Sequence, residues 1–214
     1  MIEILVAMVI LVSAFGLITV LYTRANRVKK IVSSNNDIQN ILTEMINTIT
    51  YGEKSNVLKG LINATKVYNT LGNLLKANHC YLIFGNLENA NVQYYAIAPG
   101  LDSGEPNFTF TGTDTTLWYG ERDWANNEPQ YGPPPATGSD SKRWRPVDIN
   151  AKVYLDAGSK FEFYDQRNLF PDNSSSETTL VKITLKGKST DPAMRTMASV
   201  PVQTSVRLRN KSSF

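Results

Sequence analysis

Apolar and polar positions follow a helical pattern at the start of the chain. From Ile4 to Tyr22 no residue is charged, and only Ser13 and Thr19 are polar. At 1.5 Å per residue, a helix over residues 1–22 is about 30 Å long, enough to cross the apolar core of a membrane. The pattern therefore predicts a membrane-spanning helix over residues 1–22.

The helical periodicity continues after this apolar segment. Apolar residues recur at steps of three and four, as on one face of an amphipathic helix. They are Val28, Ile31, Val32, Ile38, Ile41, Leu42, Met45, Ile46 and Ile49. No proline precedes Pro99, and Gly52 is the expected terminator. We predict one helix over residues 1–52, about 75 Å long, and call it the spine helix; its second half packs on the rest of the chain.

Residues 53–214 are expected to form one globular domain. The apolar spacing in residues 54–77 predicts a second amphipathic helix, within a helical region 53–78. Residues 79–214 are expected to be β-rich, because short runs of Val, Ile, Thr, Tyr and Phe alternate with turn residues. The expected strands are Tyr81–Phe84, Val92–Ala98, Phe108–Thr111, Lys152–Asp156, Lys160–Tyr164, Leu180–Leu185 and Val200–Leu208. The predicted fold class is α+β, a long N-terminal helix packed on an antiparallel β-rich domain.

Two local patterns refine the β-rich part. The run Leu155–Phe161 contains Gly158 between apolar strands and predicts a hairpin. In the last strand, Val202 to Leu208 alternate, which places Arg207 and Arg209 on the outward face. These two cations could be solvated or could meet a partner subunit.

The region 112–146 loses periodicity and is predicted to be a long loop. It contains all three tryptophans of the chain, and its aromatic residues are candidates for a binding site. They are Trp118, Tyr119, Trp124, Tyr131 and Trp144. They could stack on a surface ligand or on DNA bases, or they could form a satellite core or contact a neighbouring subunit. Both interpretations are open at this stage.

Composition narrows the chemistry. The formal net charge of +3 is too small to indicate nucleic acid binding by itself. The single cysteine, Cys80, excludes an internal disulfide, and we expect it to be a buried thiol. One histidine and one cysteine cannot form a Cys/His zinc cluster, and acids near the aromatic region lack EF-hand spacing. We expect no catalytic constellation, no metal and no cofactor.

The N-terminal residues carry a family resemblance. Met1-Ile2-Glu3-Ile4-Leu5 and the apolar run that follows resemble the start of a mature type IV pilin or pseudopilin. The strand ending Thr204–Asn210 is similar to the ends of J-type minor pseudopilins and PilW-like minor pilins. The resemblance covers the two ends of the chain, about a third of it, and implies a filament subunit rather than an enzyme.

The resemblance implies a processing route and partners. In that family a prepilin peptidase creates a new amino terminus, which is methylated, and the subunit lies in the inner membrane before assembly. Glu3 would pair with the amino terminus of a neighbouring subunit, and Ile2, Ile4 and Leu5 would form assembly contacts. A buried carboxylate is tolerated only when it is paired. The other interpretation of Glu3 is a headgroup-level residue of an ordinary signal anchor.

The sequence departs from the family pattern at its first residues. The usual Phe-Thr and the basic leader are missing before Met1, so we expect that the natural subunit starts further upstream. The basic residues after Tyr22 favour a cytoplasmic globular domain by the positive-inside rule, whereas the family places this domain outside the cytoplasm. A basic leader upstream would resolve this conflict.

We therefore expect a type IV pilin-like structural subunit, of minor type, in a pilus or a type II secretion pseudopilus. One alternative is a tip adhesin or DNA-binding pilin that uses residues 113–145. The other is a signal-anchored extracytoplasmic enzyme.

Overall fold

The computed structural model describes ten segments of the chain. These are residues 2–52, 60–68, 81–86, 91–100, 115–125, 128–129, 144–148, 152–165, 178–194 and 197–208. The chain divides into two compact units, Met1–Asp37 and Ile38–Phe214.

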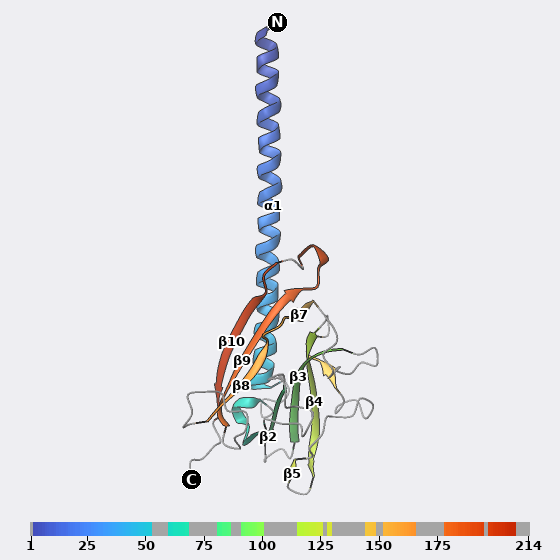
Figure 1. Cartoon of the computed structure of the whole chain (residues 1–214), viewed down its shortest axis with the longest axis vertical. Coiled ribbons are helices and arrows are strands. Elements are labelled where there is room, and N and C mark those ends of the chain that lie inside the picture. Colours follow the sequence, from blue (N-terminus) through green and yellow to red (C-terminus); the bar gives the residue numbers. More distant parts are fainter. Residues whose placement is uncertain are drawn as a thin grey trace. The chain divides into compact units, whose positions relative to one another are not determined.

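A single helix, α1 (Ile2–Tyr51), runs from the first unit into the second (Figure 1). It ends at Gly52, whose φ of 80° lies in the left-handed region, and whose N–H donates to the carbonyl of Thr48 at 2.9 Å. Glycine adopts this conformation without the steric strain that a Cβ would cause. Its N–H can therefore bond to a carbonyl of the last helical turn. The predicted extent of the spine helix is confirmed.

The second unit is built on an antiparallel sheet. Its order is β1-β2-β3-β4-β7-β9-β10, with β5 and β6 pairing β4 and with β8 pairing β9. The strands are β1 (Lys66–Tyr68), β2 (Tyr81–Asn86), β3 (Asn91–Pro99), β4 (Thr115–Ala125), β5 (Glu128–Pro129), β6 (Arg145–Pro146), β7 (Val153–Leu155), β8 (Lys160–Asp165), β9 (Thr178–Ser189) and β10 (Val200–Arg207). Two short 3-10 turns, η2 (Leu61–Asn63) and η5 (Pro192–Met194), complete the described elements.

The main core lies between one sheet face and the last turns of α1. The helix contributes residues spaced by three and four, so that they share one face: Ile38, Leu42, Met45, Ile46 and Ile49. Alternate residues of the strands face them, and these include Leu82, Phe84, Ile97, Leu117, Phe161, Val181, Ile183 and Leu185. This packing confirms the α+β class.

Strands β2 to β4 are buried on both faces. A second cluster on the opposite face contains Tyr81, Ile83, Val92, Tyr94, Ala96, Ala98, Trp118 and Trp144. Double burial explains why β3 is apolar almost without interruption from Tyr94 to Ala98, where a half-solvated strand would alternate.

The second amphipathic helix predicted over residues 54–77 is wrong in the part that the structure describes. Residues 61–63 form η2, and residues 66–68 form β1, which pairs with β2. Leu61 and Val67 are both buried in the main core. The apolar residues of the range 54–77 recur with helical spacing, but the edge of β2 offers backbone hydrogen bonds to an extended chain, and this pairing decides the conformation of residues 66–68.

The predicted hairpin at Leu155–Phe161 is also wrong. Strands β7 and β8 both pair antiparallel with β9, with Leu155 opposite Gly187 and Lys160 opposite Thr184. Four residues of one strand therefore face two residues of β9, which is a large bulge in a nearly continuous strand. The hydroxyl of Ser159 bridges it, because it accepts from the Lys186 N–H at 2.9 Å and donates to the Lys186 carbonyl at 3.3 Å.

The predicted loop at 112–146 needs a correction as well. Residues 115–125 form β4, a central strand that pairs with β3 along nine residues, and residues 145–146 form β6. The other strand predictions that fall on described segments are confirmed within a few residues at each end. The predictions for Phe108–Thr111 and Cys80 lie outside the described residues.

Candidate functional site

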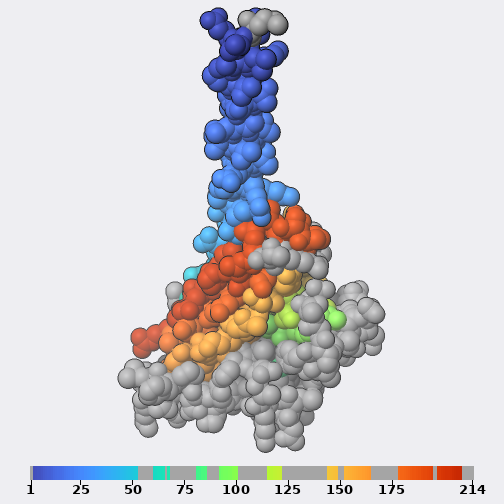
Figure 2. All heavy atoms as spheres, turned by 45° about the horizontal axis from the view of Figure 1, so that its top comes forward, coloured from blue at the N-terminus to red at the C-terminus, as the bar shows by residue number. Residues whose placement is uncertain are grey.

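The apolar N-terminal segment of α1 is exposed on all sides. Every residue from Ile2 to Lys30 is solvent-exposed, with Ile2 at 81% and Leu5 at 67% of its maximum. The side chains of this segment project around the helix (Figure 2). An apolar surface of this extent requires a membrane or a protein partner, because monomeric soluble proteins seldom expose such patches.

The two hydroxyl side chains between Ile4 and Tyr22, Ser13 and Thr19, make their hydrogen bonds within the helix. Ser13 donates to the carbonyl of Val9, and Thr19 donates to the carbonyl of Phe15, both at 2.8 Å. Because each hydroxyl finds its acceptor one turn back, none needs water in an apolar environment. By length and composition, α1 is apolar enough to cross a membrane.

The four predicted assembly residues lie together in the first turn of α1. Ile2, Glu3, Ile4 and Leu5 are all exposed. Glu3 is the only charged side chain between Ile2 and Thr23. A carboxylate at a helix N-terminus is favoured by the helix dipole, but in an apolar environment it also needs a cation.

A basic stretch follows the apolar segment. Arg24, Arg27, Lys29 and Lys30 are exposed, and the helix has turned from uncharged to cationic within two turns of Tyr22. Cations at the end of a membrane span interact favourably with anionic headgroups. The residues therefore mark one border of the apolar segment, and Glu3 marks the other.

Three of the five candidate aromatic residues lie in the protein core. Trp118 and Trp144 are 5% and 3% exposed and belong to the second cluster, and Tyr119 belongs to the main core. The Trp118 indole N–H donates to the carbonyl of Ala98 at 3.0 Å, and the Trp144 ring meets the Tyr94 ring edge-on at 6.4 Å. With their faces packed, these rings support the satellite-core interpretation rather than ligand stacking.

The other two aromatic candidates cannot be placed in the same way. Trp124 lies on β4, but its side chain and the whole of Tyr131 are outside the described segments. Since β4 is a central strand, removing residues 113–145 would delete part of the core rather than a ligand loop.

A polar cluster that the sequence did not suggest lies on the helix-facing side of β3 and β4. The Tyr119 hydroxyl donates to Glu121 at 2.9 Å, and the Arg145 guanidinium lies 4.9 Å from the Tyr119 ring centre. Burial raises the pKa of Tyr119, and the neighbouring Tyr95 and Glu121 raise this pKa further. Gln93, opposite Glu121 in the register, is 1% exposed, and neither polar atom of its amide has a hydrogen-bond partner among the described residues.

An ion pair lies at the bulge before β8. Lys188 contacts Asp156 at 3.0 Å. Partial desolvation raises the pKa of Asp156, but hydrogen bonds from Lys188 and from the Ala157 amide, with the Lys188 charge, outweigh it and leave this pKa below its usual value. This pair has a structural role, since it joins the bulge to β9.

Among the described residues, no group of three or more His, Cys, Asp or Glu side chains is placed to hold a metal ion. Comparisons with protein-family models, with curated proteins and with solved structures give no match for this chain. The fold and the site define a class, a β-sheet protein with a long N-terminal helix suited to membrane anchoring.

Proposed function

We propose that this chain is a type IV pilin-like subunit, of minor type, that assembles through α1 into a pilus or a type II secretion pseudopilus. One observation carries the proposal. A single unbroken helix has an N-terminal half with no buried residue and a C-terminal end that forms one side of a core. The first half is therefore free to exchange lipid neighbours for protein neighbours, while the second half holds the folded unit.

The assembly step would use the exposed apolar segment. In the membrane, lipid tails contact residues 4–22, and in a filament the helices of neighbouring subunits replace them. Packing between helices, rather than removal from water, then drives association. Unpaired Glu3 would make this step costly, so pairing with a cation of a neighbouring subunit would select one axial register.

The proposed topology follows from the family resemblance. The subunit would reside in the inner membrane with its β-sheet unit outside the cytoplasm. A prepilin peptidase would process it, and its partners would be other pilin or pseudopilin subunits. The self-satisfied hydroxyls of the apolar segment and the basic stretch from Arg24 to Lys30 support a membrane-resident stage.

Glu3→Ala tests the role of the carboxylate. We expect the variant to insert into the membrane normally, because an acidic group has been replaced by a small apolar one. Its amount in sheared filaments should fall at least about tenfold, since about 1.4 kcal/mol of lost pairing is tenfold in an equilibrium. The measurement compares immunoblots of the membrane and filament fractions.

The matched control is Glu44→Ala, which removes an exposed carboxylate from the same helix outside the apolar segment. It should enter filaments like the unchanged protein. Normal incorporation of Glu3→Ala into filaments would falsify the assembly role of Glu3. If both variants are lost from filaments, the defect comes from removing any negative charge from α1 and not from Glu3 in particular.

A further inference from the structure

Strand β10 forms one edge of the sheet. It pairs antiparallel with β9 along its whole length, from Val200 opposite Gly187 to Arg207 opposite Leu180, and with no other strand of the described chain. Figure 1 shows β10 outside β9, with β8 on the other side of β9. One side of the β10 backbone therefore has no strand partner among the described segments.

One hydrogen bond fixes which backbone groups point to that free side. The Leu208 N–H donates to the carbonyl of Thr179 at 3.0 Å, and the register continues to place these two residues opposite each other. In an antiparallel ladder, hydrogen-bonded pairs alternate with non-bonded pairs. The N–H and C=O groups of Gln203, Ser205 and Arg207 therefore point away from β9.

The position of Pro201 agrees with this assignment. It belongs to the same outward set, where its missing N–H removes no bond to β9, and proline is confined to such edge positions. Pro201, Gln203, Ser205 and Arg207 are all exposed. No backbone hydrogen bond to another described element occupies their outward groups.

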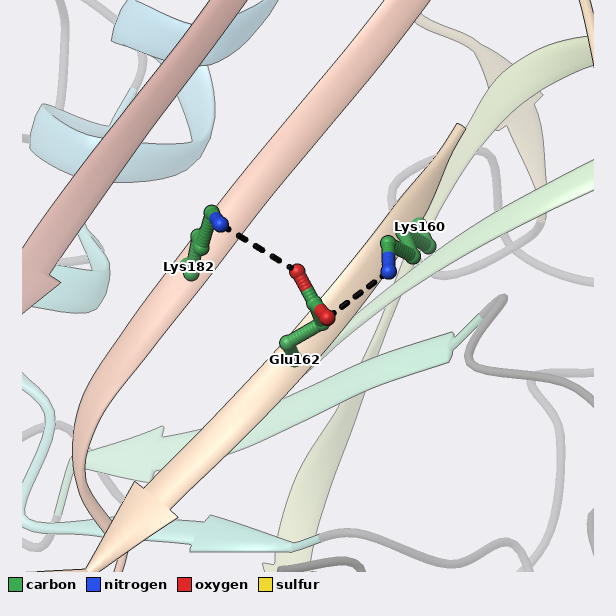
Figure 3. A network of polar contacts seen from close by, with 3 residues as sticks. All are labelled: Lys160, Glu162 and Lys182. Atoms are coloured by element: carbon green, nitrogen blue, oxygen red, sulfur yellow. Dashed lines mark hydrogen bonds and ion pairs between the residues drawn. The ribbon is translucent and has the colours of Figure 1, made fainter. Parts of the chain in front are cut away.

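The outer face next to this edge is cationic. Among the described side chains of β7 to β10 and the bulge between β7 and β8, the outer face has Lys160, Lys182, Lys186, Lys188 and Arg207 against only Glu162 and Asp156. Glu162 is shared by two of the lysines, at 2.7 Å from Lys160 and 3.7 Å from Lys182 (Figure 3). Neither Lys186 nor Arg207 has an ion-pair partner in the described structure, which leaves an excess of positive charge.

We propose that the free edge of β10 binds an extended segment of a partner protein by strand addition, and that this segment carries acidic residues at alternate positions. Three N–H donors and four carbonyls of β10 would continue the sheet into the partner strand. Acidic side chains on the outer face of the added strand would lie beside Arg207 and near the lysines of β9. This inference does not depend on the proposed filament role.

The test uses the full chain in detergent micelles and a defined probe. The probe is a capped seven-residue peptide of alternating valine and glutamate. Amide hydrogen exchange is followed by NMR at single residues. With saturating peptide, exchange at Gln203, Ser205 and Arg207 should slow at least about tenfold, because these amides acquire acceptors. Exchange at Val202, Thr204 and Val206 should not change, because their amides already bond to β9.

Two modified peptides separate strand addition from charge attraction alone. One is N-methylated on its valines and the other on its glutamates. An added strand directs alternate N–H groups to β10, so one version should lose the protection and the other should keep it. The proposal is overturned if the two N-methylated peptides bind equally well. It is also overturned if neither of them protects the three amides and the unmodified peptide does not protect them either.

Charge and self-association complete the test. Arg207→Glu should weaken binding of the valine and glutamate peptide at least about threefold and strengthen binding of the corresponding valine and lysine peptide, whereas Arg207→Lys should bind nearly as the unchanged chain does. Equal binding of acidic and basic peptides contradicts the proposed partner chemistry. Concentration-dependent protection of the three amides without peptide would identify a second copy as the occupant, and would overturn the proposal too.

Discussion

At the residue scale, Gln93 places a whole amide group in the described core, where it is 1% exposed. Gln93 is opposite Glu121 in the strand register, yet both polar atoms of its amide lack hydrogen-bond partners in the described part of the chain. A buried amide without partners destabilises the folded state by about 1–3 kcal/mol. The Tyr119 hydroxyl donates to Glu121, so it has no proton left to donate to the Gln93 carbonyl oxygen.

Gln93→Leu should therefore stabilise the second unit. We expect the unfolding free energy to rise by about 1–2 kcal/mol, because the desolvated amide is replaced by an apolar group of similar volume. For a unit of this size the melting temperature should rise by about 2–6 °C. Thermal unfolding by circular dichroism provides the measurement. Gln203→Leu, on the exposed face of β10, is the control and should change little; a lower melting temperature for Gln93→Leu would mean that the amide has a bonding partner.

Residue roles were only partly predictable from sequence. The alternation that places Arg207 outward and Val206 inward was readable, and it is confirmed. The roles of the aromatic residues could not be predicted, because a tryptophan in a Gly- and Pro-rich region looks the same in sequence whether it packs in a core or binds a ligand. Trp118 is buried because β4 places it beside Trp144 and Tyr94 on the second sheet face.

At the element scale, the end of α1 depends on a close backbone approach. A Cβ placed on Gly60 would lie 2.4 Å from the carbonyl carbon of Tyr51 and 2.6 Å from the carbonyl oxygen of Thr50. These atoms are backbone and cannot move aside without displacing the last turn of the helix. Only glycine allows the chain to return so close to the helix end and to lead into η2 and β1.

Gly60→Ala should destabilise the second unit by about 2–3 kcal/mol, at the upper end of the usual cost of overpacking. Urea denaturation of the full chain in detergent, monitored by tryptophan fluorescence, measures this change. Gly16→Ala is the matched control, because a Cβ there has no neighbour within 4 Å, and it should leave the same transition unchanged. If the two variants unfold alike, the close approach at Gly60 is not a constraint.

Elements that depend on pairing were the ones that the sequence misassigned. The apolar spacing over residues 54–77 fits a helix, but the edge of β2 pairs with residues 66–68 instead. The turn residues around Gly158 fit a hairpin, but β9 pairs with the strands on both sides of them. In both cases a strand that is distant in sequence supplies the hydrogen bonds, and local periodicity contains no information about that strand.

At the scale of the whole molecule, the buried residues of α1 begin at Ile38. The segment from Ile2 to Lys30 contributes nothing to either hydrophobic cluster. The exposed apolar stretch, which is suited to a membrane, and the stretch that packs in the core are thus different parts of one helix.

A truncation that removes residues 1–23 should be recovered without detergent, with a thermal transition within a few degrees of the full chain. The physical reason is that no core residue is lost. A truncation that removes residues 1–45 takes away Ile38, Leu42 and Met45 and should lose several kcal/mol or fail to fold, since each buried Leu, Ile or Met truncation costs about 2–5 kcal/mol. Scanning calorimetry of both forms is the measurement. Equal stability of the two truncations would contradict the role of the last turns of α1 as part of the core.

The sequence by itself determined the features that rest on local periodicity and on single residues. These are the extent of α1, its apolar segment with Glu3 near the start, its end at Gly52, and most of the strands. The tertiary structure alone decided the features that need a distant partner. It made residues 66–68 a strand, turned the expected hairpin into a bulge, buried Trp118 and Trp144, and placed β10 at an edge of the described sheet. The reason is that hydrogen-bond and packing partners far apart in sequence meet only in the folded sheet.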